Sequence, residues 1–198
     1  MKIGLDFDDV VFDFIGSLTK WHNEKYHRND SVKDYKEFFW GPVWQTNREE
    51  TIKRVDEFLE SHRIQEVPPL SKAIESIKSL LKHNDITVIT GRPPRFKEKT
   101  KDWISYHLNE RLEVIIAGEF HKGQAESKAV ICNKNNISLL IEDAPQTALD
   151  CANSDIIVLL FDKSWNQGII HKNIIRVKDW NQIMYEIDKI SLKTNILS

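Results

Sequence analysis

Residues 3–11 read Ile3-Gly4-Leu5-Asp6-Phe7-Asp8-Asp9-Val10-Val11, an apolar run that passes directly into three carboxylates. Residues 2–7 have the length and apolar content of a buried strand. In open α/β sheets, ligands bind beyond the carboxyl ends of the strands. Carboxylates gathered there repel one another unless a cation neutralises them, and Mg²⁺ takes oxygen ligands of this kind. The stretch therefore predicts a cation site, although Asp8 and Asp9 alone would also suit the cap of a following helix.

Four more short stretches rich in Ile, Val and Leu predict buried strands, at residues 86–90, 114–117, 139–141 and 156–160. Helical patterns lie between them, at residues 97–108, 126–133 and 146–152. Near-continuous apolar strands that alternate with helices favour a parallel sheet covered on both faces. The predicted fold class is therefore α/β, with a Rossmann-like parallel sheet.

The interval between the first two strands is much longer than a crossover connection requires. It contains helical stretches at residues 12–26, 31–39 and 49–61, followed by the break Pro68-Pro69. We interpret this interval as a small helical cap inserted after the first strand. The predicted division places residues 1–14 and 72–198 in the α/β core and residues 15–71 in the cap.

The formal net charge of -2 does not indicate binding to a nucleic-acid polymer or a membrane. The longest apolar run, residues 156–161, is far too short for a membrane helix, and the N-terminus lacks the pattern of a signal peptide. Neither Cys132 nor Cys151 lies in a Cys-x-x-Cys pair, no Cys/His cluster has zinc-ligand spacing, and reduced thiols suit a cytoplasmic protein. We therefore expect a cytoplasmic location, and the sequence leaves open whether the chain forms a homodimer.

Polar groups also stand at two later strand ends. The second strand ends in Thr90-Gly91-Arg92, and the fourth ends in Glu142-Asp143. Two acidic residues directly after a buried strand are costly without a cation. A guanidinium is a suitable charged donor for phosphate. Each group taken alone is weak evidence, but their order along the chain matches a known series of motifs.

The pattern Asp6-x-Asp8-x-Val10 resembles the first motif of the haloacid dehalogenase superfamily. The resemblance implies that Asp6 is the nucleophile that takes a phosphoryl group and that Asp8 is the general acid/base. Asp6 and the backbone carbonyl of Asp8 would also bind Mg²⁺. The second aspartate favours a phosphatase over a dehalogenase. The family usually has Gly where this chain has Asp9, to which we assign no role.

The resemblance extends to the later strand ends and assigns them to phosphate binding. Thr90 would bond a phosphoryl oxygen, Gly91 would allow close backbone approach, and Arg92 could add a charged donor.

The third and fourth motifs of the superfamily supply a lysine and a further acidic residue. Lys128, which opens a helix before the fourth strand, matches the lysine that neutralises phosphate and nucleophile, with Lys99 and Lys122 as alternatives. Asp143 would be a further Mg²⁺ ligand. Glu142 would orient either water or the lysine.

Residues 6–14 and 21–26 resemble the start of the 5'(3')-deoxyribonucleotidases, the 5'-nucleotidase type C family, and residues 162–166 resemble one of their loops. Phe14 matches an aromatic residue that lines the base pocket in that family. The expected substrate is therefore a small phosphate ester, most specifically a nucleoside monophosphate.

An aromatic cluster in the cap, residues 38–44, could stack a nucleotide base through Trp40 and Trp44. Packing between cap helices is the alternative for each ring. Because Trp40 and Trp44 flank a Gly-Pro turn, we expect them to be more exposed than Phe38.

The expected activity is Mg²⁺-dependent hydrolysis of (deoxy)ribonucleoside monophosphates through an aspartyl-phosphate intermediate. Two alternatives stay open at this point. The chain could be a phosphatase for another small metabolite, such as a sugar phosphate, or a non-catalytic nucleotide-binding module. Base, sugar and 5' versus 3' preference are not determined by the sequence.

Overall fold

The computed structural model describes residues 1–118 and 126–197, and its side chains up to residue 192. These residues form a six-stranded sheet in the order β3-β2-β1-β4-β5-β6, in which every neighbouring pair is parallel. The strands are β1 (Lys2–Leu5), β2 (Asp85–Thr90), β3 (Glu113–Ile116), β4 (Leu139–Glu142), β5 (Ile157–Phe161) and β6 (Ile174–Val177). The predicted α/β class with a parallel sheet is confirmed.

The register of the central strands brings their carboxyl ends to one edge of the sheet. Leu5 of β1 pairs with Val88 of β2 on one side and with Ile141 of β4 on the other. The next residue, Asp6, continues the ladder by donating its N–H to the carbonyl of Ile141 at 2.9 Å. Asp6 therefore follows β1 at the level where β4 also ends.

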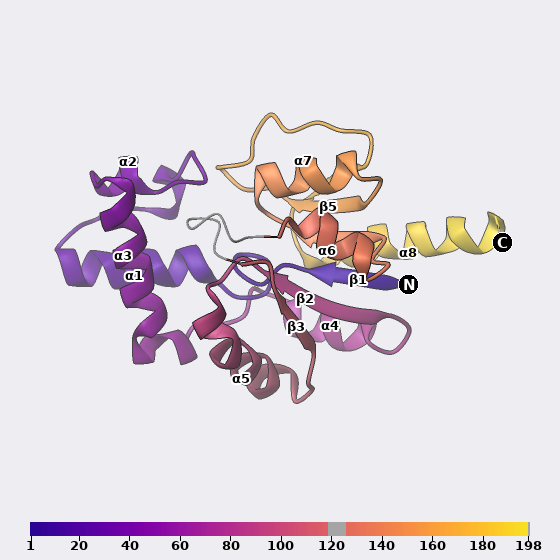
Figure 1. The fold of residues 1–198 in the computed structure, drawn as a ribbon, viewed down its shortest axis with the longest axis horizontal. Helices are drawn as coiled ribbons and strands as arrows, with labels where there is room; N and C mark the ends of the chain where they lie inside the picture. The colour runs from indigo at the N-terminus through magenta and orange to yellow at the C-terminus, as the bar shows by residue number, and fades with distance from the viewer. Residues whose placement is uncertain (119–125, 198) are drawn as a thin grey trace.

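Helices cover both faces of the sheet. Successive residues of a strand point to opposite faces, so the apolar side chains of one strand pack against helices on both sides. Leu140 packs with the helices α6 and α7, whereas Ile141 packs in the larger core with α4, α5 and α8. Figure 1 shows α6 and α7 on one side of the strands and α4 and α5 on the other. These helices are α4 (Ala73–Leu80), α5 (Lys97–Leu108), α6 (Lys128–Lys134), α7 (Pro145–Asn153) and α8 (Trp180–Leu197).

Three further helices between β1 and β2 lie together beyond one end of the sheet (Figure 1). They are α1 (Phe14–Tyr26), α2 (Gly41–Trp44) and α3 (Arg48–Glu60). The helix predicted over residues 31–39 is wrong, because only a 3₁₀ turn forms there, at Val32–Asp34. The division of the chain into core and cap at the predicted boundaries stays a prediction.

Among residues 1–118 and 126–197, no helix is both long and apolar enough to span a membrane.

Candidate active site

A lysine and two carboxylates meet at the carboxyl ends of β1 and β4. Lys128 Nζ lies 2.5 Å from Asp6 Oδ1 and 2.8 Å from Glu142 Oε2. All three side chains are buried. Burial alone would lower the pKa of Lys128, but the two carboxylates outweigh it and raise that pKa. The ammonium therefore stays charged between its two partners.

The start of α6 delivers Lys128 to this position. Ser127 caps the helix, with its side chain accepting the N–H of Val130. Lys99, an alternative for the same role, instead donates to the carbonyls of Leu59 at 3.2 Å and Glu60 at 3.3 Å, at the end of α3. Lys122, the other alternative, lies outside the described residues.

Three buried acidic residues are close enough to share one cation. Asp6, Glu142 and Asp143 each offer a carboxylate oxygen, and these oxygens all lie within 4.8 Å of one another. Glu142 Oε1, the oxygen that does not contact Lys128, accepts the N–H groups of Asp143 at 3.0 Å and Ala144 at 2.9 Å. Three carboxylates and one ammonium leave an excess of negative charge, and oxygen ligands of this kind suit Mg²⁺. The residues present therefore fit a magnesium ion.

The raised pKa values of two aspartates in this cluster also indicate that it lacks positive charge. Burial, reinforced by Glu142, raises the pKa of Asp6 to about 8 even with Lys128 in contact. Burial also raises the pKa of Asp143 well above its ordinary value, with Glu142 and Asp6 adding to the effect. A bound cation would favour the ionised form of both groups.

Asp8 does not join this cluster through its side chain, because Arg92 holds it. Arg92 Nε lies 2.9 Å from Asp8 Oδ2, and Arg92 Nη2 lies 2.6 Å from Asp8 Oδ1. The sequence did not reveal this contact, since the two residues are far apart in the chain and the arginine was predicted to bind phosphate.

The end of β2 carries the other predicted phosphate ligands. The Thr90 hydroxyl oxygen accepts the N–H of Arg92 at 3.2 Å, which leaves the hydroxyl proton available to donate. An ideal Cβ built on Gly91 would meet no atom within 4 Å, so the space beside this residue is open.

Asp9 has a structural role that the sequence suggested as an alternative. Its Oδ1 accepts the N–H of Ile15 at 3.0 Å, near the start of α1, and its backbone has a φ of 57°. Burial raises the pKa of Asp9 to about 7, while Lys163 and the Ile15 N–H act in the opposite direction. Asp9 therefore caps the entry to α1, as considered from the sequence, whereas Asp8 does not.

The predicted base-binding aromatics differ in exposure. Phe14 is buried and packs against Trp40, with ring centroids 5.6 Å apart, while Trp40 is half-buried. Trp44 is only 2% exposed and Trp40 is half-buried, whereas Phe38 is 53% exposed, so the expected order of exposure is wrong for both tryptophans.

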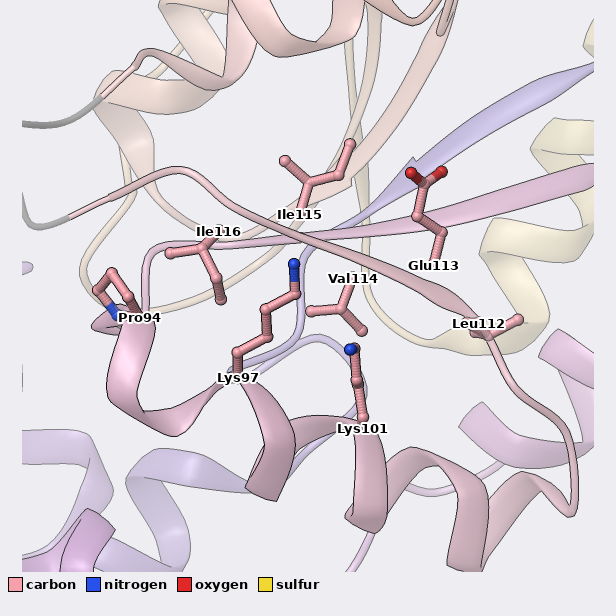
Figure 2. Close-up of a pocket in the computed structure, with 8 residues that line it drawn as sticks. All are labelled: Pro94, Lys97, Lys101, Leu112, Glu113, Val114, Ile115 and Ile116. Atoms are coloured by element: carbon pink, nitrogen blue, oxygen red, sulfur yellow. The ribbon is translucent and has the colours of Figure 1, made fainter.

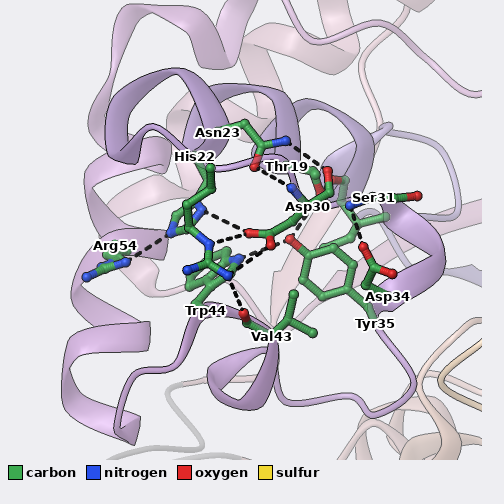
Figure 3. Close-up of polar contacts among 12 residues, drawn as sticks. Thr19, His22, Asn23, Asp30, Ser31, Asp34, Tyr35, Val43, Trp44 and Arg54 are labelled. Atoms are coloured by element: carbon green, nitrogen blue, oxygen red, sulfur yellow. Dashed lines mark hydrogen bonds and ion pairs between the residues drawn. The ribbon is translucent and has the colours of Figure 1, made fainter.

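Trp44 is buried because a polar network encloses it (Figure 3). Its ring stacks on His22 at a centroid distance of 4.1 Å, and its Nε1 donates to the Tyr35 hydroxyl at 3.0 Å. Burial, aided by Arg54, lowers the pKa of His22 to about 4, so the imidazole is neutral at physiological pH. This packing fixes Trp44 within the helices around it and leaves Trp40 as the more accessible indole.

A groove of about 550 Å³ opens elsewhere, between α5 and the edge strand β3 (Figure 2). Two lysines, Lys97 and Lys101, face the strand across it. None of the predicted site residues is among the described residues that line this groove. It is therefore separate from the carboxylate cluster.

Comparison with known proteins gives the same family as the motifs. The family model described as "5' nucleotidase, deoxy (Pyrimidine), cytosolic type C protein" matches residues 1–193. A Bacillus subtilis protein provisionally named a nucleotidase is 26% identical over 193 residues, covering 91% of this chain and 90% of that one. A nucleotidase of Clostridium acetobutylicum is 23% identical over 198 residues, covering 96% of this chain and 98% of its own length.

A solved structure supports the fold. The haloacid dehalogenase family hydrolase from Deinococcus radiodurans, with bound phosphate and sodium, superposes with a TM-score of 0.62 at 8% identity, covering 96% of each chain. Such low identity is evidence for the fold alone. Because the family model covers nearly the whole sequence, the chain belongs to the cytosolic type C family of 5' nucleotidases, deoxy (Pyrimidine), and is an enzyme with a haloacid dehalogenase-like fold.

Proposed function

We propose that the chain is a Mg²⁺-dependent phosphomonoester hydrolase that acts on (deoxy)ribonucleoside 5'-monophosphates through an aspartyl-phosphate intermediate. The observation that carries the proposal is the buried cluster in which Lys128 contacts Asp6 and the Asp143 carboxylate lies close by. This cluster combines a nucleophile, a cation and acidic ligands at the strand ends where ligands bind. Membership of the nucleotidase family supports the substrate class.

The reaction proceeds in two displacements at phosphorus. In the first, an Asp6 oxygen bonds to phosphorus while the bond from phosphorus to the 5' ester oxygen breaks, and Asp8 gives a proton to that oxygen. In the second, Asp8 takes a proton from water as the water oxygen bonds to phosphorus and the bond to Asp6 breaks. Inorganic phosphate leaves, and both aspartates return to their starting states.

Positive charge and hydrogen-bond donors stabilise the phosphoryl oxygens during both displacements. Lys128 is already beside the nucleophile, and the Thr90 hydroxyl has a proton to donate. The open space at Gly91 allows a ligand to approach the backbone. Mg²⁺, when bound by Asp6, Asp143 and the Asp8 carbonyl, would supply further positive charge at the same oxygens.

The helices α1, α2 and α3 would form the cap over the substrate and supply the contacts to the base. Trp40 is the best-suited stacking group, because it is half-buried against Phe14 and its ring is not enclosed as that of Trp44 is. A stacking contact contributes about 1–3 kcal/mol per base in single-strand binders.

The test is phosphate release from a panel of nucleoside 5'- and 3'-monophosphates, with glycerol phosphate as a substrate without a base. We expect Mg²⁺-dependent turnover of one or a few nucleotides, abolished by EDTA. Asp6→Asn should lower kcat by roughly 10³-fold or more, because it removes the nucleophile. Asp102→Asn, the same change at an exposed position, is the matched control. Near-normal turnover by folded Asp6→Asn protein would refute the mechanism.

The contribution of the base is tested separately. Trp40→Ala should raise KM for nucleotides roughly tenfold, which corresponds to about 1.4 kcal/mol of lost stacking, and leave KM for glycerol phosphate unchanged. Phe38→Ala removes an exposed aromatic two residues away and serves as the control. Equal effects of Trp40→Ala on both substrates would assign the tryptophan to packing.

A further inference from the structure

Two nitrogens of the Arg92 guanidinium donate hydrogen bonds to the carboxylate of Asp8. Its Nε lies 2.9 Å from Oδ2, and its Nη2 lies 2.6 Å from Oδ1 of the same carboxylate. The planar fork of a guanidinium matches a carboxylate in this arrangement and fixes its orientation as well as its distance. The Asp8 side chain is 24% exposed, whereas that of Arg92 is only 3% exposed. The arginine thus reaches Asp8 from the protein interior.

The guanidinium is itself held on its other sides. Nη1 donates to Thr100 Oγ1 at 3.2 Å, and that hydroxyl donates onward to the carbonyl of Phe96 at 3.0 Å. The guanidinium carbon lies 4.6 Å from the ring centroid of Phe7 and 4.4 Å from that of Phe12. Both rings are fully buried. Arg92 therefore has little freedom to turn toward another ligand.

We propose that Arg92 is a positioning residue that acts through Asp8 and is not a ligand of the phosphoryl group. The inference rests on the proposed function, in which Asp8 transfers the proton to and from the reacting oxygens. It assigns to Arg92 a different task from the phosphate binding expected from the sequence. Thr100 extends the same support by orienting Nη1.

Loss of a residue that positions Asp8 and loss of a residue that binds phosphate have different effects on the kinetics. A carboxyl group transfers a proton efficiently only when it is held within hydrogen-bond reach of the reacting oxygen. Loss of Arg92 would leave the Asp8 side chain free to rotate, which lowers kcat and leaves phosphate binding intact. A phosphate ligand would instead affect binding, so KM for the substrate and Ki for inorganic phosphate would rise together.

The decisive experiment is a double-mutant cycle between Asp8→Asn and Arg92→Lys, which keeps the charge at position 92 and removes the fork. We expect Arg92→Lys alone to lower kcat on the preferred nucleotide roughly 10- to 100-fold, within the usual contribution of acid–base catalysis. In the Asp8→Asn background the same change should alter the remaining rate less than about twofold. Full additivity of the two changes would overturn the inference.

Two further readouts keep the test sound if a buried variant is unstable. Ki for inorganic phosphate should stay the same in Arg92→Lys, and a rise equal to that of the nucleotide KM would assign Arg92 to phosphate. Thr100→Val retains Arg92 and removes the hydroxyl behind it, so it should reproduce part of the kcat loss at unchanged Ki. Arg111→Gln, at an exposed arginine before β3, is the control.

The cycle also separates the inference from the function on which it rests. Asp8→Asn with wild-type turnover of nucleotides would remove the proposed acid–base role, and with it the basis for Arg92. A strong Asp8→Asn defect combined with an additive Arg92→Lys effect would overturn the positioning role alone.

The leaving group supplies an independent check on the variant. A nucleoside alkoxide needs a proton as it leaves, whereas p-nitrophenolate leaves without one, so Arg92→Lys should impair p-nitrophenyl phosphate hydrolysis less than nucleotide hydrolysis. Equal losses on both esters would contradict positioning for the first displacement.

Discussion

The indole of Trp165 bonds directly to one of the clustered aspartates. Its Nε1 donates to Asp143 Oδ2 at 2.9 Å, and Asn166 donates to the Asp143 backbone carbonyl at 2.7 Å. Burial, reinforced by repulsion from Glu142 and Asp6, raises the pKa of Asp143, and a hydrogen bond to the charged form opposes this effect. Such a bond also fixes the direction in which the remaining oxygen points.

Trp165→Phe tests this contact at the scale of one hydrogen bond. The change keeps most of the buried ring and removes the donor, so the apparent Mg²⁺ affinity should fall roughly 10- to 100-fold. The measurement is the Mg²⁺ concentration dependence of the unfolding temperature, with activation of turnover as a second readout. Trp180→Phe also removes a buried indole donor, in that case to the Val10 carbonyl, and serves as control. Equal Mg²⁺ affinities for the two variants would contradict the orienting role.

The charged residues at two strand ends and at one helix start could be predicted from the sequence, because the order of the elements along the chain determines where they lie around the sheet. Asp6, Lys128 and Asp143 are brought together as the motif order implied. The partner of Arg92 could not be predicted, since the contact depends on a side-chain direction across distant segments. The burial of Trp44 was likewise missed, because it depends on the His22 and Tyr35 contacts.

At the scale of one element, the residue that caps α6 also determines the position of the lysine in the proposed active site. Lys128 is the first residue of the helix, and Ser127 caps it from the preceding position. The helix start thus determines where the ammonium lies relative to the cluster. A cap contributes about 1 kcal/mol to stability, but here it also positions the proposed phosphate ligand.

Ser127→Ala and Asn47→Ala form a matched pair that separates these two effects. Asn47 caps α3, with its side chain accepting the N–H of Glu50. Each change should lower the free energy of unfolding by about 1 kcal/mol, measured by urea denaturation. Only Ser127→Ala should also lower kcat, by roughly two- to tenfold, because a small displacement of Lys128 weakens its contact with the reacting groups. A larger kcat loss in Asn47→Ala would reverse this assignment.

Element prediction failed where local hydrogen bonds override helical spacing. At residues 31–39 the Ser31 side chain accepts the N–H of Lys33, and Asp34 accepts the N–H of Ser31, which closes a tight turn in place of a helix. In contrast, the sequence of α8 has a readable helical pattern, although this helix is not among those predicted. Trp180, Ile183 and Ile187 recur at helical spacing and are all buried.

At the scale of the whole molecule, the buried carboxylate cluster around Asp6 makes an unfavourable electrostatic contribution to the stability of the metal-free fold. In the metal-free protein the pKa of Asp6 is raised to about 8, mainly by burial, whereas an aspartate in an unfolded chain has a pKa of about 3.9. The folded state therefore binds a proton that the unfolded state releases between these two pH values. Cation binding and global stability are linked through this group.

The free energy of unfolding of the metal-free protein should accordingly contain a term that falls as pH rises from about 4 to about 8. The sign follows because the folded state holds more protons than the unfolded state throughout this window. Urea unfolding in EDTA at several pH values measures the slope, and saturating Mg²⁺ should flatten it by favouring the ionised carboxylates. Asp6→Asn should reduce the metal-free slope and leave the parts due to Asp9 and Asp143. In contrast, Asp102→Asn, at an exposed aspartate, should leave the slope as in the wild type. Parallel curves in EDTA and Mg²⁺ would show that the cation does not bind at this cluster.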